Sequence, residues 1–185
     1  VNEAIKSLQG KGPRDLEELC LALGSEMLVL SGLYSNAGQA SLALKQVWES
    51  GAAFEKFKEF VLAQGGDTKV VDQPELLPAA KYILPVLAEQ AGYVASIDAE
   101  MIGRCAMLLG AGRKTKESPI DLAVGLVLDK KVGSKVSSGD VLAYVHVNDS
   151  NRLEPVLPLI KAAYGFMDRE PEKKDLIYRR VASPN

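Results

Sequence analysis

The chain has 185 residues, which is enough for one large domain or two small ones. Its hydrophobic fraction of 47% and charged fraction of 25% are those of an ordinary globular protein. With 22 basic and 24 acidic side chains, the formal charge of −2 gives no basic field for nucleic acid or an anionic membrane. No apolar run approaches the roughly 20 residues that span a bilayer. We therefore expect neither nucleic acid nor a membrane as a partner, and a cytoplasmic protein.

The N-terminal part of the chain has the spacing of amphipathic helices. Apolar residues predict a first helix over 1–8, which Gly10 and Gly12 end. A second helix is predicted after Pro13, where proline suits the first turn. Its apolar stripe consists of Leu16, Leu19, Cys20, Leu23, Met27 and Leu30.

Two further helices are predicted before residue 66. Asn36 or Ser41 can cap the third helix, which Gly51 closes, and the fourth covers 53–63. Four helices with a shared apolar face suit a packing layer and show no chemistry by themselves. Because the first amphipathic segment is already under way at Val1, we expect the chain to begin inside a larger protein.

The fold class predicted from these patterns is α+β in two parts. Residues 1–72 form the helical segment, and 91–185 form a C-terminal α+β domain. Between them, 73–90 is a connector that cannot be one continuous helix, because it is punctuated by Pro74, Pro78 and Pro85.

Strand signals begin beyond residue 91. We predict a strand within 92–98, a short helix over 99–109, and two strands around a glycine-bearing turn within 120–147. Another helix is predicted over 150–164, and a closing strand over 176–181.

The stretch LQGKGPRDLEEL, residues 8–19, raises the question of a phosphate loop. A Walker loop needs G-x-x-x-x-G-K-[ST], and a dinucleotide loop needs G-x-G-x-x-G after a strand. Here the glycines follow a helix, Lys11 lies between them, and the third glycine is missing. The pattern favours a break between two helices over a phosphate site.

The stretch VGSKVSSGDVLAYVH, residues 132–146, resembles half of a biotinyl or lipoyl carrier domain. This similarity suggests a hammerhead or barrel-sandwich-like β hairpin. A carrier needs a lysine on the turn after such a strand, and 147–151 reads VNDSN. We therefore expect neither biotin nor lipoate.

Other polar residues give no catalytic constellation. Arg113, Lys114 and Lys116 form a basic cluster that is either a solvated loop or an anion-facing segment. His146 follows an apolar strand and is interpreted as a strand residue rather than a catalyst. No acid/base pair, nucleophile triad or metal cluster emerges from the spacing of the carboxylates Glu17, Glu18, Glu26, Asp67, Asp72, Asp98 and Asp121.

The two cysteines, Cys20 and Cys105, lie far apart among apolar neighbours. This setting favours two buried free thiols in a reducing compartment over a disulfide.

Three segments together resemble the pyrimidine nucleoside phosphorylases, the family that also holds thymidine phosphorylase. They are VNEAIKSLQGKGPRDLEELCLALGSEML (1–28), VWESGAAFEKFKEFVLAQGGDTKVVDQPELLP (47–78) and AGYVASIDAEMIGRCAMLLGAGRKTKESPIDLAVGLVLDKKVGSKVSSGDVLAYVH (91–146). They occur in the family's order and cover most of the chain.

The resemblance implies the C-terminal part of an enzyme that cleaves uridine, thymidine or deoxyuridine with phosphate, giving the free base and a pentose 1-phosphate. The intact enzyme would be a homodimer without an organic cofactor. Residues 1–72 would be outer helices of its large α/β domain, and 91–185 would be its C-terminal α+β domain. The family's glycine-rich phosphate stretch and its pyrimidine-binding region are absent from this sequence, so no catalytic or substrate-binding residue is carried over. Arg113 and Lys114 are only candidates for the cleft, and we expect the chain to be inactive alone.

One family site is implied near the start of the chain. Bacterial members bind a structural potassium ion through backbone oxygens and a carboxylate in a V-x-E-A-I stretch. Val1-Asn2-Glu3-Ala4-Ile5 matches that stretch, which makes Glu3 the metal ligand. The alternative is a solvated glutamate in a first helical turn, favoured there by the helix dipole.

Two other functions stay open. One is a phosphorylase selective for thymidine, and the other is a non-catalytic carrier-like or binding module built on the predicted hairpin.

Overall fold

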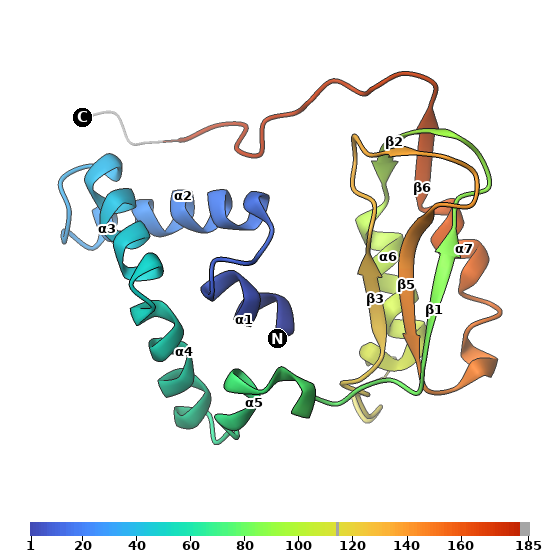
Figure 1. The fold of residues 1–185 in the computed structure, drawn as a ribbon, viewed down its shortest axis with the longest axis horizontal. Coiled ribbons are helices and arrows are strands. Elements are labelled where there is room, and N and C mark those ends of the chain that lie inside the picture. Colours follow the sequence, from blue (N-terminus) through green and yellow to red (C-terminus); the bar gives the residue numbers. More distant parts are fainter. Residues whose placement is uncertain (114, 182–185) are drawn as a thin grey trace. The chain divides into compact units, whose positions relative to one another are not determined.

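A computed structural model describes residues 1–113 and 115–181. They divide into two compact units (Figure 1): a helical unit of 1–76 with the chain from Asp175 onward, and a mixed unit of 77–174. The α+β class predicted from the sequence is confirmed, and the boundary between the units falls within the predicted connector 73–90. In these described ranges, no helix combines the length and apolarity needed to cross a membrane.

The helical unit contains the four predicted helices. They are α1 (Asn2–Leu8), α2 (Arg14–Leu30), α3 (Ala37–Glu49) and α4 (Ala52–Ala63), followed by α5 (Lys69–Asp72) and the 3₁₀ turn η1 (Pro74–Leu76). Of the two predicted caps for α3, Asn36 is used, because its Oδ1 accepts a hydrogen bond from the Gln39 amide at 2.9 Å.

The packing of α2 against α3 differs from the predicted apolar stripe. A Cβ added at Gly24 would lie 2.9 Å from Leu44 Cδ1, so the missing side chain lets the two helices approach closely. Ser25, one position further, is buried, and its hydroxyl donates to the Leu21 carbonyl. The predicted stripe lies on another side of α2, where Leu23, Met27 and Leu30 are exposed.

The mixed unit holds two three-stranded antiparallel sheets. In the first, the order is β1 (Tyr82–Leu87), β5 (Val141–Val147) and β3 (Gly125–Leu128). In the second, the order is β4 (Lys135–Val136), β2 (Gly92–Ile97) and β6 (Tyr164–Met167). Within 120–147 there are thus three strands rather than the predicted two, and the extra strand β4 belongs to the other sheet.

Both sheets share one core with the helices of this unit. The helical elements are α6 (Ala99–Ala106), the π-helical turn η2 (Met107–Ala111), the 3₁₀ turn η3 (Ser150–Arg152) and α7 (Leu157–Ala162). One cluster contains Val94 of β2, Cys105 of α6, Val145 of β5 and Ile160 of α7, all fully buried. Burial of this kind is the main stabilising term in a small domain.

Tyr164 joins the two sheets by a hydrogen bond. It lies on β6, and its buried hydroxyl donates to the Leu142 carbonyl on β5 at 3.0 Å. Burial raises the pKa of Tyr164 to about 12, so the hydroxyl keeps its proton at neutral pH.

The predicted connector 73–90 is not one continuous helix. It contains strand β1, because β1 is an edge strand and an edge tolerates Pro85. Two other sequence predictions are wrong, one in the mixed unit and one in the C-terminal segment. The helix predicted over 150–164 is interrupted near Pro155, where the backbone amide is missing, and only α7 is regular helix. The strand predicted over 176–181 is irregular chain.

The two glycines between α1 and α2 act in different ways. Gly10 has φ +72°, its amide donates to the Ser7 carbonyl at 2.9 Å, and the Lys11 amide donates to the Lys6 carbonyl at 2.8 Å. This is the pattern of a Schellman helix end. Gly12 is instead constrained by space, since an added Cβ would lie 2.6 Å from the Ser7 Cα.

Alanine and asparagine substitutions separate these two constraints. At Gly10, alanine should cost about 1–2 kcal/mol of unfolding free energy, and asparagine less, because asparagine adopts the left-handed conformation more readily. At Gly12, alanine should cost about 1–3 kcal/mol and asparagine at least as much, because the obstacle is backbone contact. Urea unfolding followed by the fluorescence of Trp48, the single tryptophan, reports on this unit. Milder loss with asparagine than with alanine at Gly12 would contradict the steric argument.

Candidate functional site

Glu3, the predicted metal ligand, lies in the first turn of α1 with an exposed carboxylate. The backbone carbonyl of Glu3 accepts a hydrogen bond from the Ser7 hydroxyl at 2.8 Å. Across 1–113 and 115–181, no group of three or more histidine, cysteine or acidic residues could hold a metal ion. Because an alkali cation takes several oxygen ligands, Glu3 alone supplies one ligand of a site, and its cation role stays a prediction.

The Gly10–Gly12 turn has little capacity to bind phosphate. A phosphate loop presents free backbone amides to the anion. Here the amides of Gly10 and Lys11 are already donated to carbonyls of α1. The interpretation of this stretch as a helix break therefore agrees with the geometry.

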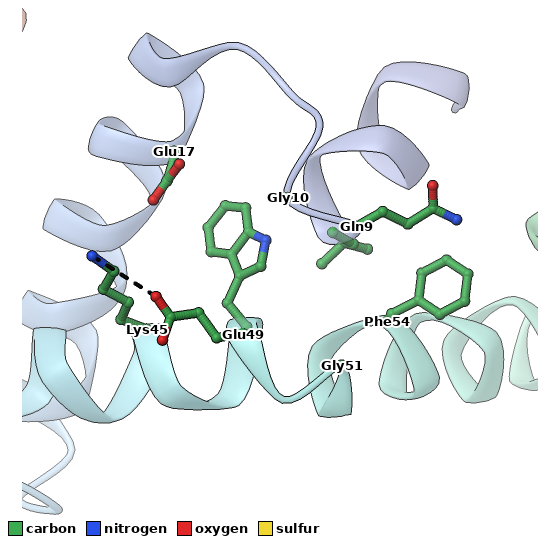
Figure 2. A pocket seen from close by; sticks show the side chains of 9 residues that line it. Gln9, Gly10, Glu17, Lys45, Glu49, Gly51 and Phe54 are labelled. Carbon is green, nitrogen blue, oxygen red and sulfur yellow. Dashed lines mark ion pairs between the residues drawn. The ribbon is translucent and has the colours of Figure 1, made fainter.

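A pocket of about 560 Å³ lies beside this turn (Figure 2). Trp48 and Phe54 contribute aromatic surface, and the indole Nε1 of Trp48 donates to the Ser7 carbonyl at 2.6 Å. The lining residues are Leu8, Gln9, Gly10, Glu17, Lys45, Trp48, Glu49, Gly51 and Phe54.

The charges of this pocket oppose an anionic ligand. Glu17 and Glu49 contribute two carboxylates, against one ammonium from Lys45. That ammonium already lies 3.9 Å from a Glu49 oxygen, and Figure 2 marks the pair. A phosphate placed here would face a net negative wall. The pocket is not suited to phosphate or a phosphorylated sugar.

The predicted basic cluster is only partly described. Arg113 is exposed just after η2, and no hydrogen bond or ion pair joins it to another described residue. Lys114 lies outside the described residues. The solvated loop and the anion-facing segment both stay predictions for this cluster.

A polar cluster around Asp121 organises the loop that follows η2. The Asp121 carboxylate accepts hydrogen bonds from the Ala123 amide at 3.0 Å and the Asn148 side chain at 2.7 Å. Asn148 in turn accepts from the Lys81 amide at 2.8 Å, next to the start of β1. The Asp121 amide donates to the Gly110 carbonyl at 3.0 Å. The cluster thus ties β1, β5 and the loop together.

These bonds set the charge state of Asp121. The Ala123 amide, followed by the Asn148 amide group, lowers the pKa of the carboxyl below its ordinary value of 3.8. Sequence reasoning missed this cluster because its members are 27 residues apart, and neither residue type is unusual in a loop.

The histidine and cysteines have structural settings. His146 is half-buried on β5, opposite Ile83 of β1 and Gly125 of β3, which agrees with its interpretation as a strand residue. Both cysteines are free thiols. Cys105 is buried, and burial raises the pKa of its thiol. Cys20 is exposed, so the prediction of two buried thiols is wrong for this residue.

The comparisons with known proteins agree on one family. Residues 93–167 match the family described as pyrimidine nucleoside phosphorylase C-terminal domain. A pyrimidine-nucleoside phosphorylase of Geobacillus stearothermophilus is 51% identical over 148 residues, which are 80% of this chain and 34% of that protein. The Bacillus subtilis protein of the same name is 51% identical over 151 residues, 82% of this chain and 35% of that protein. The chain therefore spans about a third of the length of the curated relatives it matches.

The pH dependence of stability tests the Asp121 cluster. A carboxyl with a lowered folded-state pKa stabilises the fold above its ordinary pKa of 3.8, and this contribution is lost as the pH falls through the lower folded-state value. The stability gap between the natural chain and Asp121→Asn should therefore be largest near neutral pH and shrink in acid. Urea unfolding followed by circular dichroism from pH 7 to pH 3 measures it.

A matched control for this prediction is Glu154→Gln, which removes an exposed carboxylate. The control should show no comparable gap at neutral pH. An Asp121→Asn gap that stays constant across this pH range would show that the charge of Asp121 contributes nothing.

Proposed function

Because the chain belongs to the pyrimidine nucleoside phosphorylase family, we propose that it forms the C-terminal part of an enzyme that cleaves pyrimidine nucleosides with inorganic phosphate. The observation that carries this proposal is the identity of about one half over four fifths of the chain. The substrates would be uridine, thymidine and deoxyuridine, and a thymidine-selective enzyme is the alternative within the family. The intact enzyme would be a cytoplasmic homodimer.

The proposed reaction moves the pentose from nitrogen to oxygen. A phosphate oxygen forms a bond to C1′, the bond between C1′ and the base breaks, and its electron pair leaves with the base. The products are the free base and a pentose 1-phosphate. Such a step needs donors that hold the phosphate and stabilise the leaving base.

We place those donors outside this chain. The pocket beside α1 is lined by more acidic than basic groups, and the amides of the neighbouring turn are occupied. The chain would therefore be inactive alone and would serve as scaffold, with Arg113 and Lys114 as candidates for the rim of the cleft. The mixed unit would correspond to the hammerhead or barrel-sandwich-like part of the enzyme. The antiparallel pairing of β3 with β5 supports this.

Glu3 would contribute one carboxylate to a potassium site in the intact enzyme. Its exposure at the first turn of α1 leaves both oxygens free to bind a cation. Backbone oxygens from the segment before it would supply the remaining ligands. A bound cation there would fix the start of α1 and take no part in bond breaking.

A chimera tests the proposed activity. The part of the Bacillus subtilis relative that precedes its matched segment would be joined to the N-terminus of this chain. We expect the chimera to release uracil from uridine or thymine from thymidine only when inorganic phosphate is present, and the isolated chain to release neither. Absorbance change on base release, confirmed by chromatography, measures the reaction.

The controls separate the parts of this proposal. Activity of the isolated chain would overturn the statement that it is inactive alone. A folded chimera without phosphorolysis would count against the proposed function itself. If Arg113→Ala leaves kcat and both KM values of the chimera unchanged, Arg113 has no part in the cleft.

The cation role is tested by Glu3→Gln in the same chimera. Potassium, compared with lithium at equal ionic strength, should raise the Tm of the unchanged chimera by several degrees through binding to the folded state. Glu3→Gln should abolish most of that difference, whereas Glu18→Gln on the next helix should retain it. Equal potassium effects in both variants would remove Glu3 from the site.

A further inference from the structure

Helix α2 carries apolar residues on two sides, and α3 covers only one of them. The covered side includes Gly24, which leaves room for Leu44 of α3, and the buried Ser25. Figure 1 shows α2 and α3 as neighbours within the helical unit. This side gives α2 its contact with the rest of the unit.

The other side is an exposed stripe formed by Cys20, Leu23, Met27 and Leu30, with the half-buried Leu16 at its start. These residues follow one another at intervals of four, three, four and three, which places them on one face of a helix. Leu23 is 58% exposed, Met27 69% and Leu30 85%, and Cys20 is exposed as well. A helix with this spacing normally buries such a face.

Residues 175–181 contact α2 without burying the stripe. The Arg180 guanidinium forms an ion pair with the Glu26 carboxylate, with 2.9 Å between nitrogen and oxygen. Glu26 is not a stripe residue, and the exposed fractions of Leu23, Met27 and Leu30 hold with this contact in place.

The helical unit also has a small core. Among the described residues, eighteen apolar side chains are buried, and only Ile5, Ala40 and Val71 belong to this unit. The other fifteen belong to the mixed unit. A unit of this length with so little burial gains less hydrophobic stabilisation than the mixed unit does. Covering the exposed stripe would therefore add to its stability.

We propose that the exposed stripe packs against an apolar face of the part of the intact phosphorylase that precedes this chain. This rests on the proposed function. The chain spans only 34–35% of its relatives, so about two thirds of such an enzyme is available as the occupant. A covalently joined segment is present at a high effective concentration and avoids the entropy cost of association. Both advantages favour it over a second copy of this chain.

Cys20 is a probe built into the exposed stripe. In the isolated chain, dithiobis(nitrobenzoate) should react quickly with Cys20, while the buried Cys105 reacts only on unfolding. In the chimera described above, the reaction of Cys20 should slow by at least tenfold. The difference from a Cys20→Ser version isolates this thiol from any others in the chimera.

The outcomes decide among the occupants. Equal Cys20 reactivity in the isolated chain and the folded chimera overturns the proposal. If Cys20 reacts slowly in an isolated chain that sediments as a monomer, the chain itself covers the stripe. If Cys20 reacts slowly and the isolated chain sediments as a dimer, a second copy covers the stripe. Either result also overturns it. If the chimera is active and its Cys20 stays reactive, the proposed function stands and the proposed interface is wrong. If the chimera is folded but inactive and its Cys20 is protected, the interface stands and the proposed function is wrong.

A substitution supplies a second test. Met27→Glu should leave the Tm of the isolated chain nearly unchanged but lower that of the chimera by many degrees, because it places a charge in a buried interface. The matched control is Val132→Glu, at a turn residue that is 54% exposed and far from the stripe in sequence. If the chimera does not fold, the preceding segment is co-expressed as a separate chain and Cys20 is measured in the purified complex. Failure to form either a folded chimera or a complex contradicts the proposal.

Discussion

The helical unit depends on how α2 divides its apolar residues between two sides. Gly24 lets α3 approach one side closely, and that contact fixes the pair of helices. The exposed stripe on the other side receives no such partner among the described residues. Hydrophobic burial is proportional to the area removed from water, so a half-covered helix gains only part of its available stabilisation. The turn at Gly10 and Gly12 and the Trp48 hydrogen bond to Ser7 then hold α1 against this incomplete layer.

Local signals explain why the helices were predictable and several strands were not. Helical spacing, the Asn36 cap and the glycine ends each depend on residues close together in the sequence, and α1 to α4 agree with these signals. The tolerance of β1 for Pro85 instead depends on its place at the edge of a sheet, which is set by pairing with β5 some sixty residues later. The sequence between β3 and β5 likewise indicates a turn, and it does not indicate that β4 forms there and joins the other sheet.

The candidate sites also differ in whether they depend on neighbouring residues or on residues far apart in the sequence. The amide pattern at Gly10 is local, and the sequence already favoured a helix break there. The Asp121 cluster joins residues 27 apart and has no local signature. The exposure of Cys20 depends on which side of α2 faces α3, which the periodicity of a helix with two apolar sides cannot specify. Glu3 differs from both cases, because its proposed role depends on further oxygen ligands for the cation. A single exposed carboxylate does not show whether those ligands are present.

The contrast between the two units bears on how such an enzyme is assembled. The mixed unit buries fifteen apolar side chains from both sheets and their helices, and Tyr164 adds a hydrogen bond between the sheets. It has the burial of a domain that can fold from its own contacts. The helical unit buries three and exposes the stripe on α2, so it gains less stabilisation from its own contacts. Glu3 lies in the same unit. The cation proposed at Glu3 and the proposed burial of the stripe would therefore each stabilise the folded state of this unit.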